Sequence, residues 1–185
     1  MAAPPVSKTV TYEEWLQMPE VSEGREEVVN GQIRYMPPCT APHALVVESI
    51  QVELRSQLDR KLFRILTGSF GLVIRKEPVT CREPDLAVFE QATMVIEDGY
   101  FHSAPQLVVE VISPSENRKR KDEKIRDYES IGVPECWLFG PDSRTVEVLL
   151  LENGQLRRSA ILAEGILKPR SLPGVEIDIS KIWPD

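Results

Sequence analysis

Two carboxylates placed in apolar, strand-like sequence are the residues best suited to metal chemistry. Asp85 follows Pro84 and precedes the apolar run 86–89, and Glu110 lies inside a second apolar run, 106–112. An ionised carboxylate in such a strand is costly unless it is neutralised, paired or bound to a cation. Taken alone, Asp85 is explained by a turn at a strand start, and Glu110 by a structural ion pair. Together, on adjacent central strands, they can converge on one divalent ion.

A lysine in the next charged segment is the candidate for a third group. Residues 116–131 predict a helix with Tyr128 on its inner side, and Gly132 suits its end. Lys124 stands four residues before Tyr128, so the two share a helix face. A helix that folds back over the preceding strand would bring Lys124 to Glu110. The alternative for a lysine on a charged helix is a solvated side chain.

Composition excludes several classes of protein. The 185-residue chain has three widely spaced cysteines and no CxxC pair, which argues against a disulfide framework and against a zinc site. We expect Cys39, Cys81 and Cys136 to be reduced and partly buried. No apolar run has the length of a bilayer span, and the N-terminus lacks a signal-peptide pattern. We therefore expect a soluble, cytoplasmic protein without membrane contact.

The charge of the chain limits how it could bind nucleic acid. Its net charge is −7, which disfavours a broad nucleic-acid-binding surface. The basic block 118–121 is a local exception. We expect Lys119, Arg120 and Lys121 to supply any contact with backbone phosphate, and a solvated charge run is the alternative.

The pattern of elements indicates a mixed α/β fold. Thr11 and Glu14 form a capping-box pattern, and Asn30-Gly31 and Asn153-Gly154 predict hairpins. Strands mixed with helices predict an α/β sandwich around one central mixed sheet flanked by helices, with β-hairpins at both ends. Residues 1–10 are expected to form a flexible arm and 11–185 a single domain. Helices are expected from the Thr11 cap to Met18 and over 43–62 and 116–131. Strands are expected over 27–35 (a hairpin), 70–74, 85–89, 106–112, 136–139, 145–151 and 156–162, with one or two short strands in the tail, where Val175 and Ile177 alternate.

The ordered motifs resemble the restriction endonuclease family once called domain of unknown function 820, within the PD-(D/E)XK nuclease superfamily. The resemblance spans roughly residues 10 to 180. No single motif is specific, whereas the ordered set is fairly specific. The motifs are Glu27-Val28-Val29-Asn30-Gly31, His43, Glu83-Pro84-Asp85, Val109-Glu110-Val111-Ile112-Ser113-Pro114-Ser115, Lys124, Tyr128 and Gly132-Val133-Pro134-Glu135-Cys136-Trp137-Leu138.

The resemblance implies a restriction-endonuclease-like core and a nuclease-like domain over 11–185. It implies Mg²⁺ (or Mn²⁺) bound by Asp85, Glu110 and the main-chain carbonyl of Val111. Ile112 stands where the superfamily usually has its lysine, so the lysine role is expected to pass to Lys124. The catalytic set implied is thus Asp85, Glu110 and Lys124. Glu27, His43 and Tyr128 are candidate accessory residues, and a structural hydrogen bond at a helix start is the favoured explanation for His43.

Two positions depart from the family pattern. Relatives often carry an acid where Arg120 stands, and an aspartate where Gly140 stands. Both departures put secondary metal contacts in doubt and leave the three main residues intact.

The leading hypothesis for function is a metal-dependent endonuclease that hydrolyses DNA phosphodiester bonds. The alternative is a catalytically inactive protein of the same fold, either nucleic-acid-binding or a structural homodimer whose strands after Val133 pair across a two-fold axis. The intact set of Asp85, Glu110 and Lys124 favours the enzyme. The acidic net charge argues against tight nonspecific binding of DNA. The expected partners are DNA and a second copy of the chain.

Overall fold

The computed structural model describes residues 9–19, 25–112 and 118–184. Of the predicted arm, residues 1–10, only the last two residues belong to this part. The Ser113-Pro114-Ser115 motif lies outside the described residues. Among the described residues, no helix is long and apolar enough to cross a membrane.

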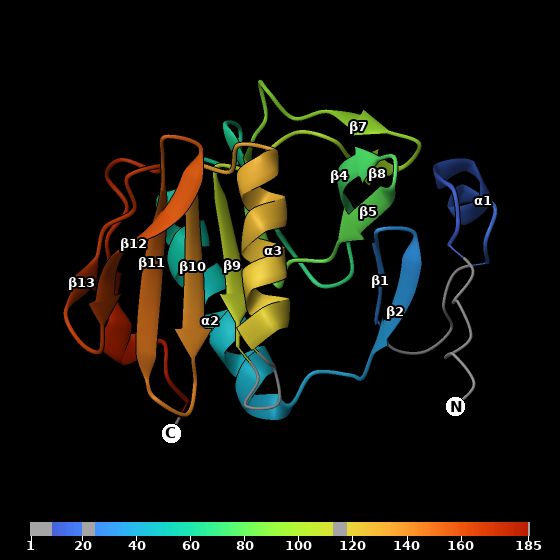
Figure 1. The fold of residues 1–185 in the computed structure, drawn as a ribbon. Helices are drawn as coiled ribbons and strands as arrows, with labels where there is room; N and C mark the ends of the chain where they lie inside the picture. The colour runs from blue at the N-terminus through green and yellow to red at the C-terminus, as the bar shows by residue number, and fades with distance from the viewer. Residues whose placement is uncertain (1–8, 20–24, 113–117, 185) are drawn as a thin grey trace, which may run out of the picture.

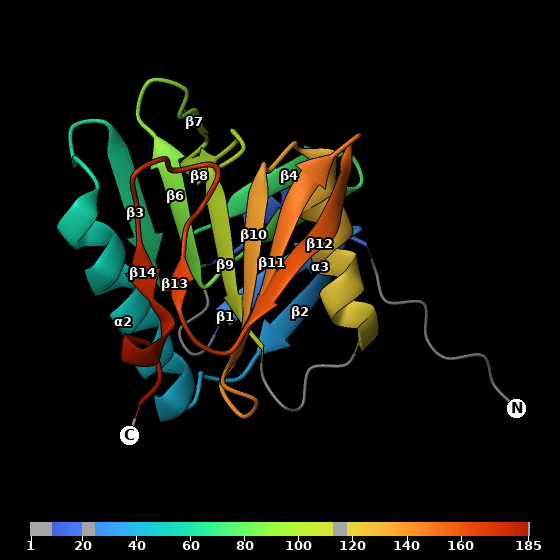
Figure 2. The same ribbon diagram turned by 90° about the vertical axis from the view of Figure 1, so that its left-hand side faces the viewer.

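A six-stranded mixed sheet forms the centre of the fold, as predicted (Figure 1). Strand β9 pairs in parallel with β10, and the other neighbouring strands pair antiparallel. Helix α2 covers one face and helix α3 the other (Figure 2). The helices are α2 (Ala41–Gln57) and α3 (Arg118–Ser130), and the sheet order is β12 (Gln155–Leu162), β11 (Thr145–Glu152), β10 (Glu135–Gly140), β9 (Leu107–Val111), β6 (Leu86–Glu90) and β3 (Phe63–Thr67).

Alternation along the central strands divides the core into two layers. In β6, Leu86 and Val88 pack into the cluster that includes α2, whereas Ala87 and Phe89 join the cluster that includes Tyr128 of α3. This is the period-two pattern of a strand covered on both faces. All five residues of β9 are buried, which confirms the prediction that the segment with Glu110 is a central strand.

A second six-stranded sheet, which the sequence pattern did not predict, lies beside the central sheet. The short helix α1 (Tyr12–Leu16) covers this sheet, and Trp15 packs with Val28 and Cys81 in a third apolar cluster. The N-terminal hairpin therefore buries its own core and does not extend the central sheet. The order is β2 (Gln32–Met36), β1 (Arg25–Val29), β5 (Val79–Arg82), β4 (Leu72–Lys76), β8 (Tyr100–Phe101) and β7 (Ile96–Glu97).

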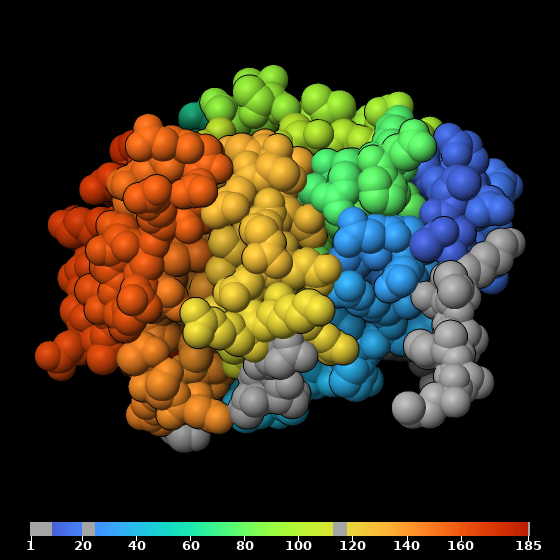
Figure 3. Space-filling view, viewed as in Figure 1, coloured from blue at the N-terminus to red at the C-terminus, as the bar shows by residue number. Residues whose placement is uncertain are grey.

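Helix α3 lies between the two sheets on one face of the molecule. Figure 3 shows it flanked by the β11–β12 hairpin on one side and by the strands β1, β2, β4 and β5 on the other. Its contacts with both β12 and β4 agree with this position. Helix α3 is therefore placed to contact both the central sheet and the second sheet.

Local signals in the sequence account for several element boundaries. The capping box of Thr11 and Glu14 is formed at the start of α1. Asn30 and Gly31 have φ values of 52° and 74°, and Asn153 and Gly154 have 50° and 76°. Positive φ at both central residues is the requirement of the two-residue hairpin turn that matches strand twist. Both predicted hairpins are confirmed.

Helix α2 does not extend to residue 62 as predicted. It begins at Ala41 and ends at Gln57. Pro42 lies in the first turn, where proline is compatible with a helix. Leu58 is already extended, and the carbonyl of Asp59 accepts hydrogen bonds from the amides of Leu62 and Phe63. Residues 63–67 then pair with β6, so tertiary pairing overrides the local pattern.

Several short strands were not predicted, and the tail is only partly as expected. The strands missed are β3, β5, β7, β8 and β13 (Ile166–Leu167), and the strand expected around 175–177 is confined to β14 (Ile177–Asp178), which leads into the 3₁₀ helix η1 (Ile179–Lys181).

Candidate active site

Asp85 and Glu110 lie at the same end of two adjacent central strands. Strands β6 and β9 are antiparallel, and Leu86 pairs with Val109. The residue before β6 therefore lies beside the last residues of β9. The amide of Val111 donates a hydrogen bond to Asp85 Oδ2 at 2.8 Å. Sheet register thus brings together two residues that are 25 positions apart in the sequence.

Asp85 is held as an anion by cationic and N–H groups. Arg25 Nη1 donates to Asp85 Oδ1 at 2.8 Å, and His43 Nε2 lies 3.1 Å from the same oxygen. Burial by itself raises the pKa of Asp85, but the hydrogen bond from His43 and the charges of His43, Arg25 and Lys124 outweigh it. The pKa of this carboxyl is therefore held well below its usual range.

Glu110 is in a different electrostatic situation, inside a fully buried strand. Lys124 Nζ donates to Glu110 Oε2 at 2.9 Å, and the Tyr128 hydroxyl donates to Oε1. The pKa of Glu110 is raised to about 7. Burial is the largest cause, and the negative charge of Asp85 acts in the same direction, whereas Lys124 acts to lower the pKa. At neutral pH this carboxyl is poised between its two protonation states.

Helix α3 folds back over the central sheet and supplies both partners of Glu110. Lys124 and Tyr128 are one helical turn apart, as the sequence spacing indicated. Lys124 Nζ also lies 4.0 Å from Glu27 Oε1 on β1. The structure therefore brings Asp85, Glu110 and Lys124 together, with Glu27 and Tyr128 next to them.

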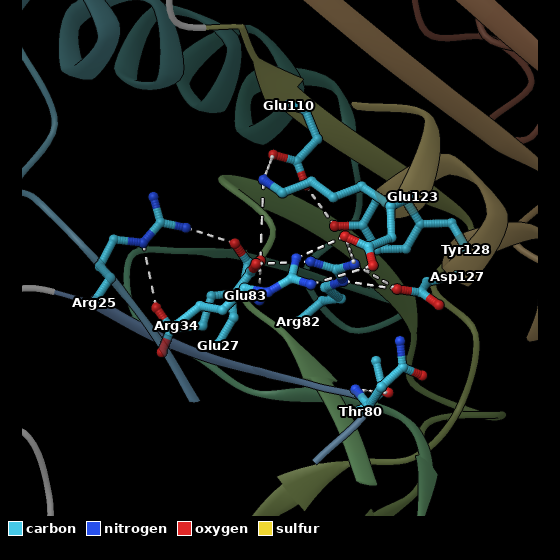
Figure 4. Close-up of polar contacts among 12 residues, drawn as sticks. Arg25, Glu27, Arg34, Thr80, Arg82, Glu83, Glu110, Glu123, Asp127 and Tyr128 are labelled. Carbon is cyan, nitrogen blue, oxygen red and sulfur yellow. Dashed lines mark hydrogen bonds and ion pairs between the residues drawn. The ribbon is translucent and has the colours of Figure 1, made fainter. Parts of the chain in front are cut away.

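A buried ion network behind the site was not found from the sequence. Arg82 is only 1% exposed; its Nη1 donates to Glu27 Oε2 at 2.8 Å and its Nε to Asp127 Oδ2 at 2.8 Å. Arg34 Nη1 donates to Glu123 Oε2 at 2.6 Å beside it (Figure 4). These bonds join the second sheet to α3, and so fix the helix that carries Lys124.

Two arginines near the carboxylates had weak sequence signals. Arg25 and Arg82 stand within two residues of Glu27 and of Glu83 respectively, which resembles ordinary surface charge. Their partners Asp85 and Asp127 are 60 and 45 positions away. Only the fold brings these groups together, and a long-range ion pair leaves no local periodicity.

The expected phosphate-binding residues lie at the start of α3. Lys119 and Arg120 are exposed there. Lys121 Nζ instead points to the central sheet, where it lies 3.4 Å from Glu147 Oε2 on β11. His43 lies in the first turn of α2, where the sequence placed it, and its imidazole pairs with Asp85. Gly140 ends β10.

The donor set at this site suits a magnesium-like ion. Within 9–19, 25–112 and 118–184, no three or more His, Cys, Asp or Glu side chains gather as a metal-binding group. Mg²⁺ typically uses one or two protein carboxylates and takes its other ligands from water and substrate phosphate. Asp85 and Glu110, with the carbonyl of Val111, match that need. The protein's own cations, Arg25 and Lys124, pair with the two carboxylates in this structure.

Comparisons with known proteins agree with this fold. A crystal structure of "a putative nuclease belonging to DUF820" from Anabaena variabilis ATCC 29413 matches with a TM-score of 0.78, 19% identity, and coverage of 94% of this chain and 97% of that one. At that identity, the likeness establishes the fold alone. No curated protein matches the sequence. The model of the Uma2 family, described as "Putative restriction endonuclease", matches residues 12–180, and the chain therefore belongs to the Uma2 family.

Proposed function

We propose that this protein is a divalent-metal-dependent endonuclease that hydrolyses phosphodiester bonds of DNA. The observation that carries the proposal is the convergence of Asp85, Glu110 and Lys124 at one end of two adjacent central strands. Membership of a family described as "Putative restriction endonuclease" supports it. A pair of carboxylates with pKa values displaced in opposite directions is typical of catalytic sites.

Asp85, Glu110 and the carbonyl of Val111 would hold Mg²⁺ or Mn²⁺. When bound, such an ion polarises a phosphoryl oxygen and lowers the pKa of a coordinated water. His43 and the amide of Val111 orient the Asp85 carboxylate. The Tyr128 hydroxyl similarly fixes one oxygen of Glu110. Because these hydrogen bonds already fix the orientation of each carboxylate, the two groups need little reorganisation to act as ligands.

Lys124 provides the positive charge for the reaction itself. Its ammonium group is 2.9 Å from Glu110 Oε2, so it lies within reach of a phosphate that approaches the same carboxylate. A preorganised cation stabilises negative charge that develops in the transition state.

One observation favours the alternative of an inactive protein. Asp85 and Glu110 are paired with Arg25, His43 and Lys124 in this structure. An ion network complete in itself would stabilise the fold without any divalent ion. The two functions differ in what they predict for metal dependence and for cleavage.

DNA cleavage tests the proposal directly. Supercoiled plasmid and single-stranded DNA are incubated with Mg²⁺ or Mn²⁺, and with a chelator. Wild type is expected to nick or cut DNA only with metal, and Asp85→Asn, Glu110→Gln and Lys124→Met are each expected to lose about 100-fold or more of the rate. Lys168→Met is the control, because Lys168 pairs with exposed Glu176. Equal background cleavage by wild type and variants with every metal would reject the enzyme.

A further inference from the structure

A cleft of about 480 Å³ adjoins the proposed site. Of the three catalytic candidates, Asp85 lines this cleft, whereas Glu110 and Lys124 do not. Helix α2 contributes lining residues between His43 and Gln51. The end of β3 and the turn after it contribute residues 67–69. Arg25, His43 and Asp85 line the cleft and also belong to the site. The other lining residues are Pro38, Cys39, Ala44, Val47, Glu48, Gln51, Thr67, Gly68 and Ser69.

The cleft has the size and lining of a small-ligand site. Pockets of roughly 300–1,000 Å³ take ligands of drug or cofactor size, with apolar walls and a few placed polar groups. Ala44 and Val47 provide apolar surface, and Glu48, Thr67 and Ser69 provide hydrogen-bonding groups. Such walls suit the flat, apolar faces and polar edges of one nucleobase.

Its two walls are fixed to each other, so the cleft is a built feature of the fold. Gln51 Nε2 donates to Thr67 Oγ1 at 2.9 Å and links α2 to the end of β3. Gly68 has φ +89°, a conformation that favours glycine, and a Cβ there would meet no atom within 4 Å.

Two groups able to donate hydrogen bonds to a phosphate, Arg25 and His43, lie at one end of the cleft. Arg25 and His43 both approach Asp85 at that end. A duplex cannot enter a space of this volume, whereas a single nucleotide drawn out of the stack can. The net charge of −7 also disfavours the many phosphate contacts by which proteins hold duplex DNA.

We infer that this cleft holds one unpaired nucleotide of the DNA strand, next to the phosphate that reaches Asp85. The inference rests on the proposed function and adds its substrate class, which is single-stranded DNA or duplex DNA with an unpaired nucleotide. Ala44 and Val47 contact the base, and Arg25 contacts the adjoining phosphate. A perfectly paired duplex is a poor substrate, because it must first give up stacking and pairing.

Binding of a fluorescently labelled oligothymidylate, measured by anisotropy with Ca²⁺ and with a chelator, tests the inference. Ala44→Trp fills the cleft and should weaken binding about tenfold. Leu45→Trp is the matched control, because Leu45 is the next residue of the same helix, is 48% exposed and does not line the cleft. Leu45→Trp should bind as wild type does, and a paired duplex should bind more weakly than the single strand.

A second variant guards against loss of binding through misfolding. Glu48 is exposed and lines the cleft, so Glu48→Gln removes repulsion of the DNA backbone and should strengthen binding roughly twofold. Glu53→Gln, on the same helix outside the cleft, should change nothing. Equal affinities for single strand and duplex, equal effects of the two tryptophan variants, or no binding in either buffer would overturn the inference.

The outcome of this binding assay does not depend on whether the protein cleaves DNA. Because the assay measures affinity, a protein that never cleaves DNA still shows the difference between Ala44→Trp and Leu45→Trp if the cleft binds a nucleotide. Conversely, cleavage that depends on Asp85 but is unaffected by Ala44→Trp on single-stranded DNA would keep the nuclease and reject the nucleotide cleft.

Discussion

Asp85 and Glu110 lie on neighbouring strands but differ in how strongly the protein holds their negative charge. Asp85 sits at a strand end, where Arg25, His43 and a main-chain amide all reach it. Glu110 is inside a buried strand and has Lys124 and Tyr128 as its partners. The same sheet register therefore produces one firmly ionised carboxylate and one that titrates near neutrality.

The affinity for Mn²⁺ is expected to rise with pH through the raised pKa of Glu110, which is about 7. A metal ligand must be deprotonated. Below this pKa a proton competes with the ion at Glu110, and above it the proton is gone, while Asp85 stays ionised throughout because its pKa is lowered. Calorimetric titration well below and well above pH 7 measures the change. Glu110→Gln should bind weakly with little pH dependence, and a wild-type affinity independent of pH would contradict this account.

Stability should move with pH in the opposite direction. Glu110 keeps its proton in the folded protein up to a higher pH than in the unfolded chain, where its pKa is near the ordinary value of 4.5. The free energy of unfolding therefore falls as pH rises between the two values, by an amount on the order of a few kcal/mol. Urea denaturation of wild type and Glu110→Gln across this range tests the sign. A difference between the two proteins that stays constant with pH would show that Glu110 titrates normally.

Arg25 is expected to compete with a divalent ion for Asp85. Its guanidinium lies 2.8 Å from Asp85 Oδ1, so Arg25→Met removes a positive charge from the proposed ion position. The affinity for Mn²⁺, measured by calorimetry, should increase by several-fold, on the order of 1 kcal/mol. Arg34→Met is the control, since Arg34 pairs with Glu123 and should leave the affinity unchanged. An unchanged or weaker affinity in Arg25→Met would show that the arginine does not occupy the ion's place.

At the scale of the elements, helix α3 is held by charge as well as by apolar contact. Tyr128 packs in the core cluster next to the sheet, and Asp127 binds Arg82 of β5. Arg82 also binds Glu27 of β1. One buried arginine thus connects α3 with two strands of the second sheet, and the position of Lys124 depends on this connection.

Removal of the buried arginine is expected to destabilise the fold strongly. Arg82→Met leaves the buried carboxylates of Glu27 and Asp127 without their main partner, which costs about 3–5 kcal/mol. Arg75→Gln is the matched control, because Arg75 also contacts Asp127 but its side chain is 33% exposed, and it should cost at most about 1 kcal/mol. Urea denaturation measures both. Similar losses in the two variants would mean that the network contributes no more than a surface ion pair.

The sequence predicts the elements with local signals and misses those defined by distant partners. Asn30-Gly31 and the Thr11 capping box are encoded within a few residues, and both are formed as predicted. The prediction of a central strand around Glu110 is confirmed for the same reason, since an apolar run marks burial on both faces. Strand β5 escaped notice, because it is defined by its pairing with β1 and β4.

The candidate site shows the same division. Asp85 and Glu110 stand out as charges in apolar sequence, and Lys124 follows from helical spacing to Tyr128. Arg25 and Arg82 do not stand out, because their partners come from other strands and helices. The roles of all these residues stay predictions, whereas their positions are properties of the fold.

At the scale of the whole molecule, the central sheet leaves β12 as an edge strand. An unpaired edge offers N–H and C=O groups to a second copy of the chain. We predict that two copies of the chain form a homodimer by antiparallel pairing of their β12 strands across a two-fold axis. Ile161 on this strand is 56% exposed, so pairing would also cover apolar surface.

Sedimentation of wild type and Ile161→Lys tests this dimer. Wild type should sediment as a dimer, and Ile161→Lys should shift toward monomer at the same protein concentration, because a charge on an edge strand opposes pairing. Ile96→Lys is the control, since Ile96 is also 56% exposed and lies on β7, the edge strand of the second sheet. A monomeric wild type, or equal shifts in both variants, would contradict pairing through β12.

Crystals containing Mn²⁺ show whether Asp85 and Glu110 bind one divalent ion beside Lys124. An anomalous difference map locates manganese without reference to activity. We expect one peak with ligands from the Asp85 carboxylate, the Glu110 carboxylate and the Val111 carbonyl, with Arg25 moved away from Asp85 Oδ1. A map at saturating Mn²⁺ with no peak at these oxygens, and with Arg25 and Lys124 still bound to the two carboxylates, would contradict this expectation.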